Sequence, residues 1–132
     1  MTESFHVSTG QRSEFTDITS QVQNIVTASQ VRDGVCQVFV PHTTAGVTIN
    51  ENADPDVTHD MITTLDQAYP WKNNYRHMEG NSAAHIKASL MGSSAMIPVS
   101  DGKLVLGIWQ CVYFCEFDGP RNRNAVVNVM GG

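Results

Sequence analysis

The residues from Lys103 to Phe117 form the longest strand-like stretch in the chain. Alternate positions divide this stretch into two faces, one starting at Leu104 and the other at Val105, and both faces are mostly apolar. A strand of this kind needs cover on both sides, because each face must be removed from water. We therefore expect a second layer of structure, or another subunit, on each side of it.

The other segments alternate between strand-like and helix-like patterns. Asp54-Pro55 starts a predicted helix over residues 55–68, with Asp as N-cap and Pro in the first turn. Further helices are expected over residues 83–90, with Asn81 or Ser82 as N-cap and Gly92 closing the helix, and between Ser20 and Gly34. Strands are expected over residues 4–8, 15–18, 35–40, 47–51, 95–99 and 124–130, with Asp101-Gly102 as the hairpin turn before the long strand. This order predicts one α+β domain over residues 1–132, mainly antiparallel, with the helices gathered on one side.

Composition argues against several classes of partner. The net charge is −5 and the 8 basic residues are scattered, which argues against nucleic acid as a partner. No apolar run approaches the ~20 residues of a membrane span, and no signal pattern is present at the N-terminus, so we expect a cytoplasmic protein without a membrane partner. Cys111 and Cys115 would lie ~13 Å apart along one strand, too far for a disulfide, so buried free thiols are expected.

The stretch from His77 to His85 concentrates the most reactive side chains. It holds two imidazoles and the Glu79 carboxylate at a predicted loop-to-helix junction. Polar groups converge at such junctions, and the N–H groups of the helix N-terminus favour an anion. A solvated loop with two incidental histidines would show the same pattern. The stretch indicates a candidate site and leaves that alternative open.

Polar side chains also follow two predicted strands. His42 and Thr43 come after the strand over 35–40, and Asn50 lies next to the last residue of the strand over 47–51. Strand ends can present reactive groups from a rigid edge. A simple polar turn between two strands is the alternative.

The long strand carries two polar interruptions. Gln110 and Glu116 stand on one of its apolar faces, and a buried carboxylate requires a partner. Arg121 and Arg123 follow the strand. Either one of them pairs with Glu116 or Asp118, or the two form a fork for a bound anion.

Taken together, the order and spacing of these stretches resemble the YjbQ-like proteins, also called the secondary thiamine-phosphate synthase family. The resemblance extends over residues 36–131. Its matching stretches are His42-Thr43-Thr44-Ala45-Gly46, Asn50-Glu51 with Asp54-Pro55, Asp60, His77 with Glu79-Gly80, His85-Ile86-Lys87, Gly107 with Trp109-Gln110, and Glu116-Phe117-Asp118-Gly119-Pro120-Arg121. Ile108 stands where the family pattern has Thr, a departure that we expect to affect packing only.

The resemblance implies sheets packed around a threefold axis in a homotrimer, with a polar pocket near the subunit boundary. In such a trimer, a partner subunit would cover one apolar face of the long strand. The activity that the resemblance implies is the joining of an aminomethylpyrimidine diphosphate to a thiazole phosphate, with release of pyrophosphate. Small phosphorylated metabolites are therefore the expected ligands.

The resemblance also suggests roles for the candidate residues. The expected catalytic residues are His42, His77, His85, Glu79, Asn50 and Glu116, and the expected phosphate-binding residues are Arg121, Arg123, Lys87, Thr43 and Gln110. The three histidines are also candidate metal ligands. Three imidazoles suit zinc, whereas diphosphate chemistry suits Mg²⁺, and the sequence leaves this choice open. A non-catalytic trimeric module that binds a metal or an anion, and a metal-dependent hydrolase of a phosphorylated metabolite, remain as alternatives.

Overall fold

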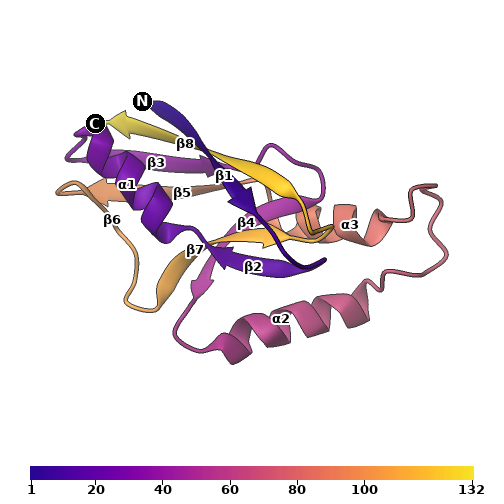
Figure 1. Cartoon of the computed structure of the whole chain (residues 1–132). Helices are drawn as coiled ribbons and strands as arrows, with labels where there is room; N and C mark the ends of the chain where they lie inside the picture. The colour runs from indigo at the N-terminus through magenta and orange to yellow at the C-terminus, as the bar shows by residue number, and fades with distance from the viewer.

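The computed structural model describes residues 1–132, which form two antiparallel sheets and three helices (Figure 1). The five-stranded sheet has the order β1 (Thr2–Ser8), β8 (Asn122–Gly131), β3 (Gly34–Phe39), β5 (Ser94–Ser100) and β6 (Lys103–Leu104). The three-stranded sheet has the order β2 (Glu14–Asp17), β7 (Gln110–Glu116) and β4 (Ala45–Glu51). Every strand pair is antiparallel, and the predicted α+β class is confirmed.

The helices are α1 (Thr19–Ser29), α2 (Pro55–Ala68) and α3 (Ser82–Met91). α2 and α3 lie where the sequence predicts them, whereas α1 ends at Ser29 and the predicted stop, Gly34, instead begins β3. The Asp54 side chain accepts a hydrogen bond from the backbone N–H of Asp56 at 2.9 Å, so Asp54 caps α2 as expected. Gly92 follows α3 with φ of 91°, a conformation that glycine adopts at no steric cost.

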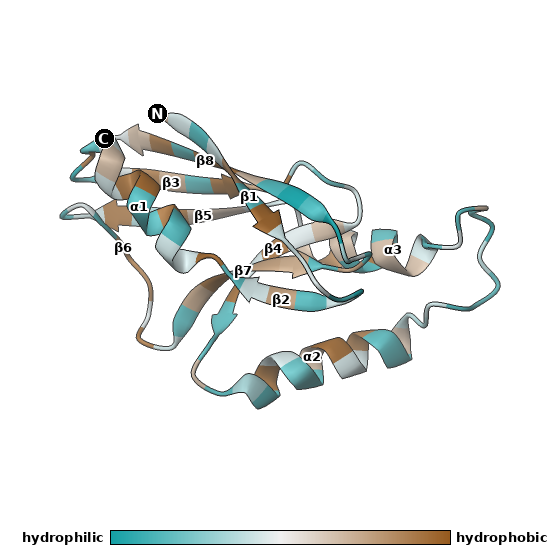
Figure 2. Ribbon diagram, viewed as in Figure 1, coloured by the Kyte–Doolittle hydropathy of each residue, from teal (hydrophilic) through white to brown (hydrophobic).

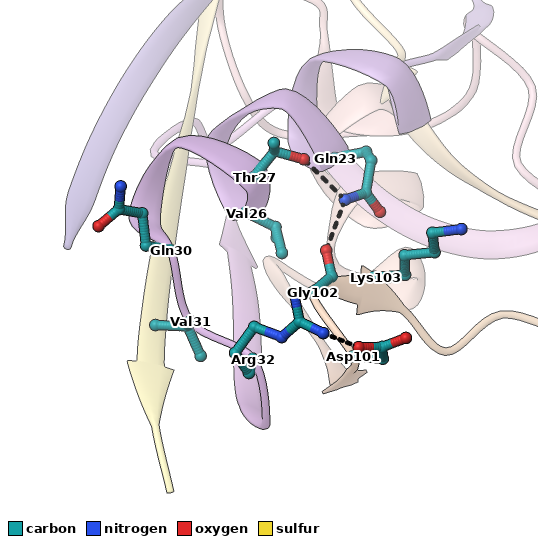
Figure 3. Close-up of a pocket in the computed structure, with 9 residues that line it drawn as sticks. All are labelled: Gln23, Val26, Thr27, Gln30, Val31, Arg32, Asp101, Gly102 and Lys103. Atoms are coloured by element: carbon teal, nitrogen blue, oxygen red, sulfur yellow. Dashed lines mark hydrogen bonds and ion pairs between the residues drawn. The ribbon is translucent and has the colours of Figure 1, made fainter.

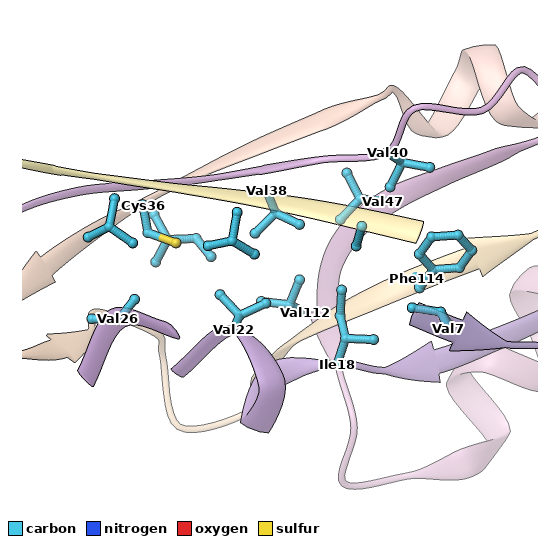
Figure 4. Close-up of a cluster of buried hydrophobic side chains, with 14 of the residues drawn as sticks. Val7, Ile18, Val22, Val26, Cys36, Val38, Val40, Val47, Val112 and Phe114 are labelled. Atoms are coloured by element: carbon cyan, nitrogen blue, oxygen red, sulfur yellow. The ribbon is translucent and has the colours of Figure 1, made fainter. Parts of the chain in front are cut away.

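The main hydrophobic core lies between the two sheets and α1 (Figure 4). Val22 and Val26 of α1 pack with Val38 of β3 and with Val112 and Phe114 of β7, and all five side chains are fully buried. Figure 2 shows the hydrophobic residues concentrated in the strands, whereas the loop that joins α2 to α3 is largely hydrophilic. The alternation predicted for residues 110–117 therefore buries one face of β7 in this core.

The opposite face of β7 packs in a second, smaller cluster. Cys111, Tyr113, Cys115 and Phe117 contact Ala84 and Ala88 of α3, with Leu65 and Trp71 at the edge. Both faces of β7 are thus covered by layers of the same chain, as the apolar alternation requires. Of the two alternatives that the sequence left open, a second layer within the chain is the one that covers residues 111–117. All three cysteines are free and buried, so no disulfide forms.

The predicted single strand over residues 103–117 is also wrong. Lys103 and Leu104 pair with β5, and the Val105 N–H donates to the Pro98 carbonyl at 2.8 Å. The chain then leaves the five-stranded sheet and enters the three-stranded sheet at Gln110. A turn at Gly107 makes this crossing, closed by a 2.9 Å hydrogen bond from the Gln110 N–H to the Gly107 carbonyl. The crossing leaves Ile108 88% exposed and Trp109 59% exposed.

The outward face of the five-stranded sheet has apolar side chains that remain exposed. Phe39, Met96 and Met130 are 41%, 56% and 44% exposed, and neighbouring positions of the same face hold Val35, Pro98 and Val126. We call this set of six residues the open sheet face. Gln37 and Asn128 lie between these residues on the same face, so the apolar side chains form exposed patches interrupted by polar groups. Exposed apolar patches with a polar surround are typical of protein–protein interfaces.

Helix α2 is only loosely attached to the rest of the fold. None of its residues is buried. Figure 1 shows α2 set apart from the five-stranded sheet. Its Asp66 side chain forms an ion pair with Lys87 of α3, and Leu65 reaches the second cluster. None of the three helices combines the length and apolar character that a bilayer span needs.

Candidate functional site

Three histidines that are distant in the sequence lie on one side of the molecule. His77, in the loop before α3, and His85, in the first turn of α3, have ring centroids 5.4 Å apart with perpendicular planes. His42 lines a cavity of about 440 Å³ together with His85, and His77 lines a cavity of about 380 Å³ that also includes His85. We call this region the histidine face.

The lining of the two cavities is rich in hydrogen-bond donors. Besides the histidines, the polar side chains are Thr43, Ser89 and Ser93 in the first cavity and Tyr75, Arg76 and Ser82 in the second. No Asp or Glu lines either cavity. A surface of imidazole, guanidinium and hydroxyl groups favours an anionic ligand with several acceptor oxygens.

His42 is held by a backbone group. The Asn124 N–H donates a hydrogen bond to Nε2 of His42 at 3.0 Å, and the ring packs edge-on to Phe114 with centroids 6.4 Å apart. Partial burial, followed by the nearby Arg123 guanidinium, lowers the pKa of His42 below its ordinary value. The neutral ring therefore predominates at pH 7, with its proton on Nδ1.

The histidines do not fit a resident metal ion within one chain. No group of three or more His, Cys, Asp or Glu side chains has the arrangement needed to hold a metal. In addition, Nε2 of His42 already accepts the Asn124 N–H, so ligation through either ring nitrogen would disrupt that bond. The metal-ligand interpretation of His42, His77 and His85 does not match this geometry.

Glu116 and Arg123 form a buried ion pair below the histidine face. Nε of Arg123 donates to Oε1 of Glu116 at 2.8 Å, and Glu116 and Arg123 are 0% and 6% exposed. The Thr9 hydroxyl and the Asp118 N–H also donate to the carboxylate, at 2.8 and 2.9 Å. Burial alone would raise the pKa of Glu116, but the hydrogen bonds, led by that from Arg123, hold it below its ordinary value.

This ion pair corrects two of the expected roles. Arg123 is not available to bind phosphate, because its guanidinium is buried against Glu116 and Thr44. Glu116 has no exposed surface through which to contact a substrate. Of the two sequence alternatives for the arginines, pairing within the chain is the one that forms.

The other two expected phosphate-binding cations are also paired. Lys87 is buried and bonds to Asp66, so its ammonium group attaches α3 to α2. The Arg121 guanidinium contacts Asp118 through a 3.1 Å hydrogen bond and is half exposed. Neither residue lines a cavity of the histidine face.

The remaining expected residues separate into two groups. Thr43 lines the first cavity of the histidine face, and Glu79 is exposed in the adjoining loop. Asn50 and Gln110 are exposed at the opposite end of the β4–β7 strand pair, where Glu51 pairs with Gln110. β4 extends ~20 Å from Ala45 to Glu51, so a single chain does not bring Asn50 or Gln110 to the histidines.

Sequence reasoning missed one charged member of the histidine face. Arg76 lines the second cavity beside His77, and its only signal was its position next to a motif histidine. The backbone N–H of Asn124 was also missed. Its role depends on where β3 ends relative to β8, which no local sequence pattern indicates.

The largest cavity of the chain, about 570 Å³, lies elsewhere, between α1 and the β5–β6 turn (Figure 3). Its polar groups largely satisfy one another: Arg32 pairs with Asp101, and the Gln23 amide donates to the Gly102 carbonyl at 3.0 Å. None of the expected site residues lines it. We therefore regard this cavity as a junction between structural elements and place the candidate site at the histidine face.

Comparisons with known proteins agree with this fold. The chain matches the family model described as "UPF0047 protein YjbQ-like" over residues 3–132. It is 48% identical to the UPF0047 protein YugU of Bacillus subtilis, covering 99% of this chain and 100% of the relative. A UPF0047 protein of Methanocaldococcus jannaschii is 50% identical, with 96% of this chain and 92% of the relative covered.

Solved structures give the same result. An uncharacterised YjbQ/UPF0047 protein of Clostridium acetobutylicum is 54% identical, with a TM-score of 0.96 and coverage of 97% of this chain and 99% of that protein. A protein of Sulfolobus solfataricus, described as YbjQ-like and of unknown function, is 34% identical, with a TM-score of 0.96 and coverage of 100% and 97%.

These relatives correct the expected activity. They are named as UPF0047 proteins or described as being of unknown function, and none of their names attributes thiamine-phosphate synthesis to them. The expected thiamine-phosphate synthase function is therefore wrong as an assignment for this chain. What the sequence, the fold and these relatives establish together is that the chain belongs to the YjbQ-like family.

Proposed function

We propose that the protein is a cytoplasmic homotrimer that binds a small phosphorylated metabolite at the boundary between protomers. The observation that carries this proposal is the lining of the histidine face. Two cavities share His85, and together they present three imidazoles, the Arg76 guanidinium and several hydroxyls without a carboxylate. Phosphate oxygens accept hydrogen bonds from all of these groups.

The start of α3 adds backbone donors to this surface. Asn81, at the N-cap position, makes no side-chain capping bond, and its amide instead donates to Asp118 at 2.9 Å. Ser82, the first residue of α3, lines the second cavity. Uncapped N–H groups in the first turn of a helix favour a bound anion.

The family motif residues support a site shared by two protomers. His42 and His85 lie at one end of the β4–β7 strand pair, whereas Asn50 and Gln110 lie at the other end, ~20 Å away. Head-to-tail contact between copies would bring the two ends together, and such contacts form closed rings when the rotation closes. Three copies is the number that the family resemblance implies.

The surface of the chain is suited to such an assembly. The open sheet face and the exposed Ile108 and Trp109 provide apolar area that a neighbouring copy would bury. The three cysteines are buried and unpaired, which fits a reducing compartment such as the cytoplasm.

A second candidate function is acid–base turnover of the bound metabolite. The adjacent rings of His77 and His85 favour it, because one imidazole can donate a proton while the neighbouring imidazole accepts one. A screen of phosphate esters would test this, with loss of turnover in His77→Gln as the expected result. Unchanged turnover in that variant would exclude His77 from the reaction.

Calorimetric titration of the full chain with inorganic phosphate and pyrophosphate tests the binding proposal directly. We expect His85→Ala to weaken binding about tenfold or more, because both cavities lose their shared ring. His59→Ala is the matched control, since His59 is an exposed histidine on α2 outside both cavities. Repeating the titration with a chelator and with Mg²⁺ measures whether a divalent ion accompanies the phosphate. Equal binding by wild type and His85→Ala would contradict the proposal.

A further inference from the structure

The hydrogen bond to His42 replaces a backbone hydrogen bond just beyond the end of the β3–β8 pairing. β3 ends at Phe39, which pairs with Val126 of β8, so Asn124 has no β3 residue opposite it. The Asn124 N–H donates to Nε2 of His42 at 3.0 Å instead. The imidazole therefore takes the place of a strand carbonyl, and its orientation is tied to the position of β8.

This bond determines which ring nitrogen of His42 can donate a hydrogen bond to a ligand. A nitrogen that accepts a hydrogen bond must carry its lone pair, so the proton of the neutral ring stands on Nδ1. No group of the chain accepts a hydrogen bond from Nδ1 of His42, although the ring lines the first cavity. Nδ1–H is thus left as a free donor at the histidine face.

The buried ion pair holds both partners of this bond. Arg123 precedes Asn124 in β8, and its Nη2 donates to the Thr44 hydroxyl at 2.8 Å. Thr44 lies in the same loop as His42, two residues further along, and its carbonyl accepts the Phe117 N–H at 3.2 Å. Glu116 fixes the other side of the Arg123 guanidinium. One network therefore connects the His42 loop to the start of β8.

We propose that Glu116 and Arg123 are positioning residues for His42: through Thr44 and Asn124 they hold its ring in the Nδ1–H form, as a hydrogen-bond donor to a ligand oxygen. Both residues are buried and contact no ligand themselves. That the oxygen belongs to a phosphate rests on the proposed function, whereas the tautomer does not.

Nitrogen-15 NMR of the imidazole rings in the ligand-free full-length protein tests this proposal, because ring nitrogen shifts distinguish the two tautomers. Thr44→Val removes one hydroxyl from the network inside the His42 loop. Thr9→Val is the matched control, because Thr9 also bonds to Glu116 but lies outside that loop. Glu116→Gln tests the ion pair itself, and Thr44→Val remains informative if the Gln variant does not fold.

We expect a single Nδ1–H form of His42 in wild type and in Thr9→Val. Thr44→Val should give a mixture of tautomers and bind phosphate about fivefold more weakly, the size of one lost hydrogen bond. An Nε2–H form in wild type, an unchanged tautomer in Thr44→Val, or an equal shift in both threonine variants would overturn the positioning role. An Nδ1–H form in wild type together with no phosphate binding would instead overturn the proposed function.

Discussion

The two ends of the β4–β7 strand pair differ in how many contacts the protomer itself supplies to their polar side chains. At the histidine end, Glu116 and Arg123 form a buried network that fixes the His42 loop. At the other end, Asn50 and Gln110 are exposed, and the neighbouring Ile108 is 88% exposed. The first end is organised within the protomer. At the second end the polar and apolar side chains are exposed, as expected of a surface that contacts a neighbouring copy in the proposed assembly.

This difference separates two kinds of mutational effect. Changes at the histidine end should alter the stability of the fold, because they leave buried charges unpaired. Changes at the opposite end should leave the protomer stable and affect only assembly and ligand binding.

Arg123→Met should lower the free energy of unfolding by about 3–5 kcal/mol, because it leaves the buried Glu116 carboxylate without its cation. Arg121→Met is the matched control and should cost less than about 1 kcal/mol, since the Arg121–Asp118 pair is half exposed. Urea denaturation at matched protein concentration measures both values. Similar losses in the two variants would show that burial does not distinguish the two arginines.

Ile108→Ser should weaken the proposed trimer without destabilising the protomer. Burying an isoleucine side chain contributes roughly 1.5–3 kcal/mol, so the dissociation constant of the assembly should rise about tenfold or more. Sedimentation velocity across a concentration series measures this change. A variant that assembles like wild type would remove the 105–109 segment from the interface.

The stability of the fold should also decrease at acid pH, because Glu116 at the histidine end becomes protonated. The pKa of Glu116 is lowered in the folded state. The stabilisation of the fold by the Glu116 carboxylate is therefore complete above the ordinary glutamate pKa of about 4.3. The contribution is lost as the pH falls through the folded-state pKa. The melting temperature should therefore decrease more steeply with falling pH for wild type than for Glu116→Gln. An equal pH dependence of the two melting temperatures would mean that the ion pair with Arg123 does not stabilise the charged form of Glu116.

Asn50→Ala should have the smallest effect on the fold. The Asn50 side chain is exposed and bonds only to the neighbouring Glu51 N–H, at 2.7 Å, so the unfolding free energy should change by about 0.5 kcal/mol or less. Phosphate binding by the assembled protein should weaken about fivefold, as for one lost hydrogen bond. Calorimetry against wild type measures this, and unaltered binding would place Asn50 outside the site.

The sequence predicted those parts of the fold that have local causes. Asp54-Pro55 located the start of α2, and the residues before Gly92 located the end of α3. The error over residues 103–117 arose because apolar alternation continues through the Gly107 crossing. The pattern of side chains therefore showed no sign of the turn that moves the chain from one sheet to the other.

For the candidate site, the sequence identified residue types better than it identified roles. It selected His42, His77 and His85, and the structure places His85 between the other two, in a cavity with each of them. It could not show that Arg123 and Lys87 are buried in ion pairs, since their partners become neighbours only through tertiary packing. It also could not show that Asn50 lies at the end of β4 remote from the histidines, because this depends on the direction of β4.

The central claim is that the ligand site combines the histidine end of one protomer with the opposite end of the next. Mixing His85→Ala with Asn50→Ala at equal concentration, after dissociation and reassembly, tests this claim most directly. Each variant alone should bind phosphate weakly, whereas about a quarter of the sites in the mixed assembly should pair an intact His85 with an intact Asn50 and recover wild-type affinity. A mixture that binds no better than the average of its two components would contradict the account.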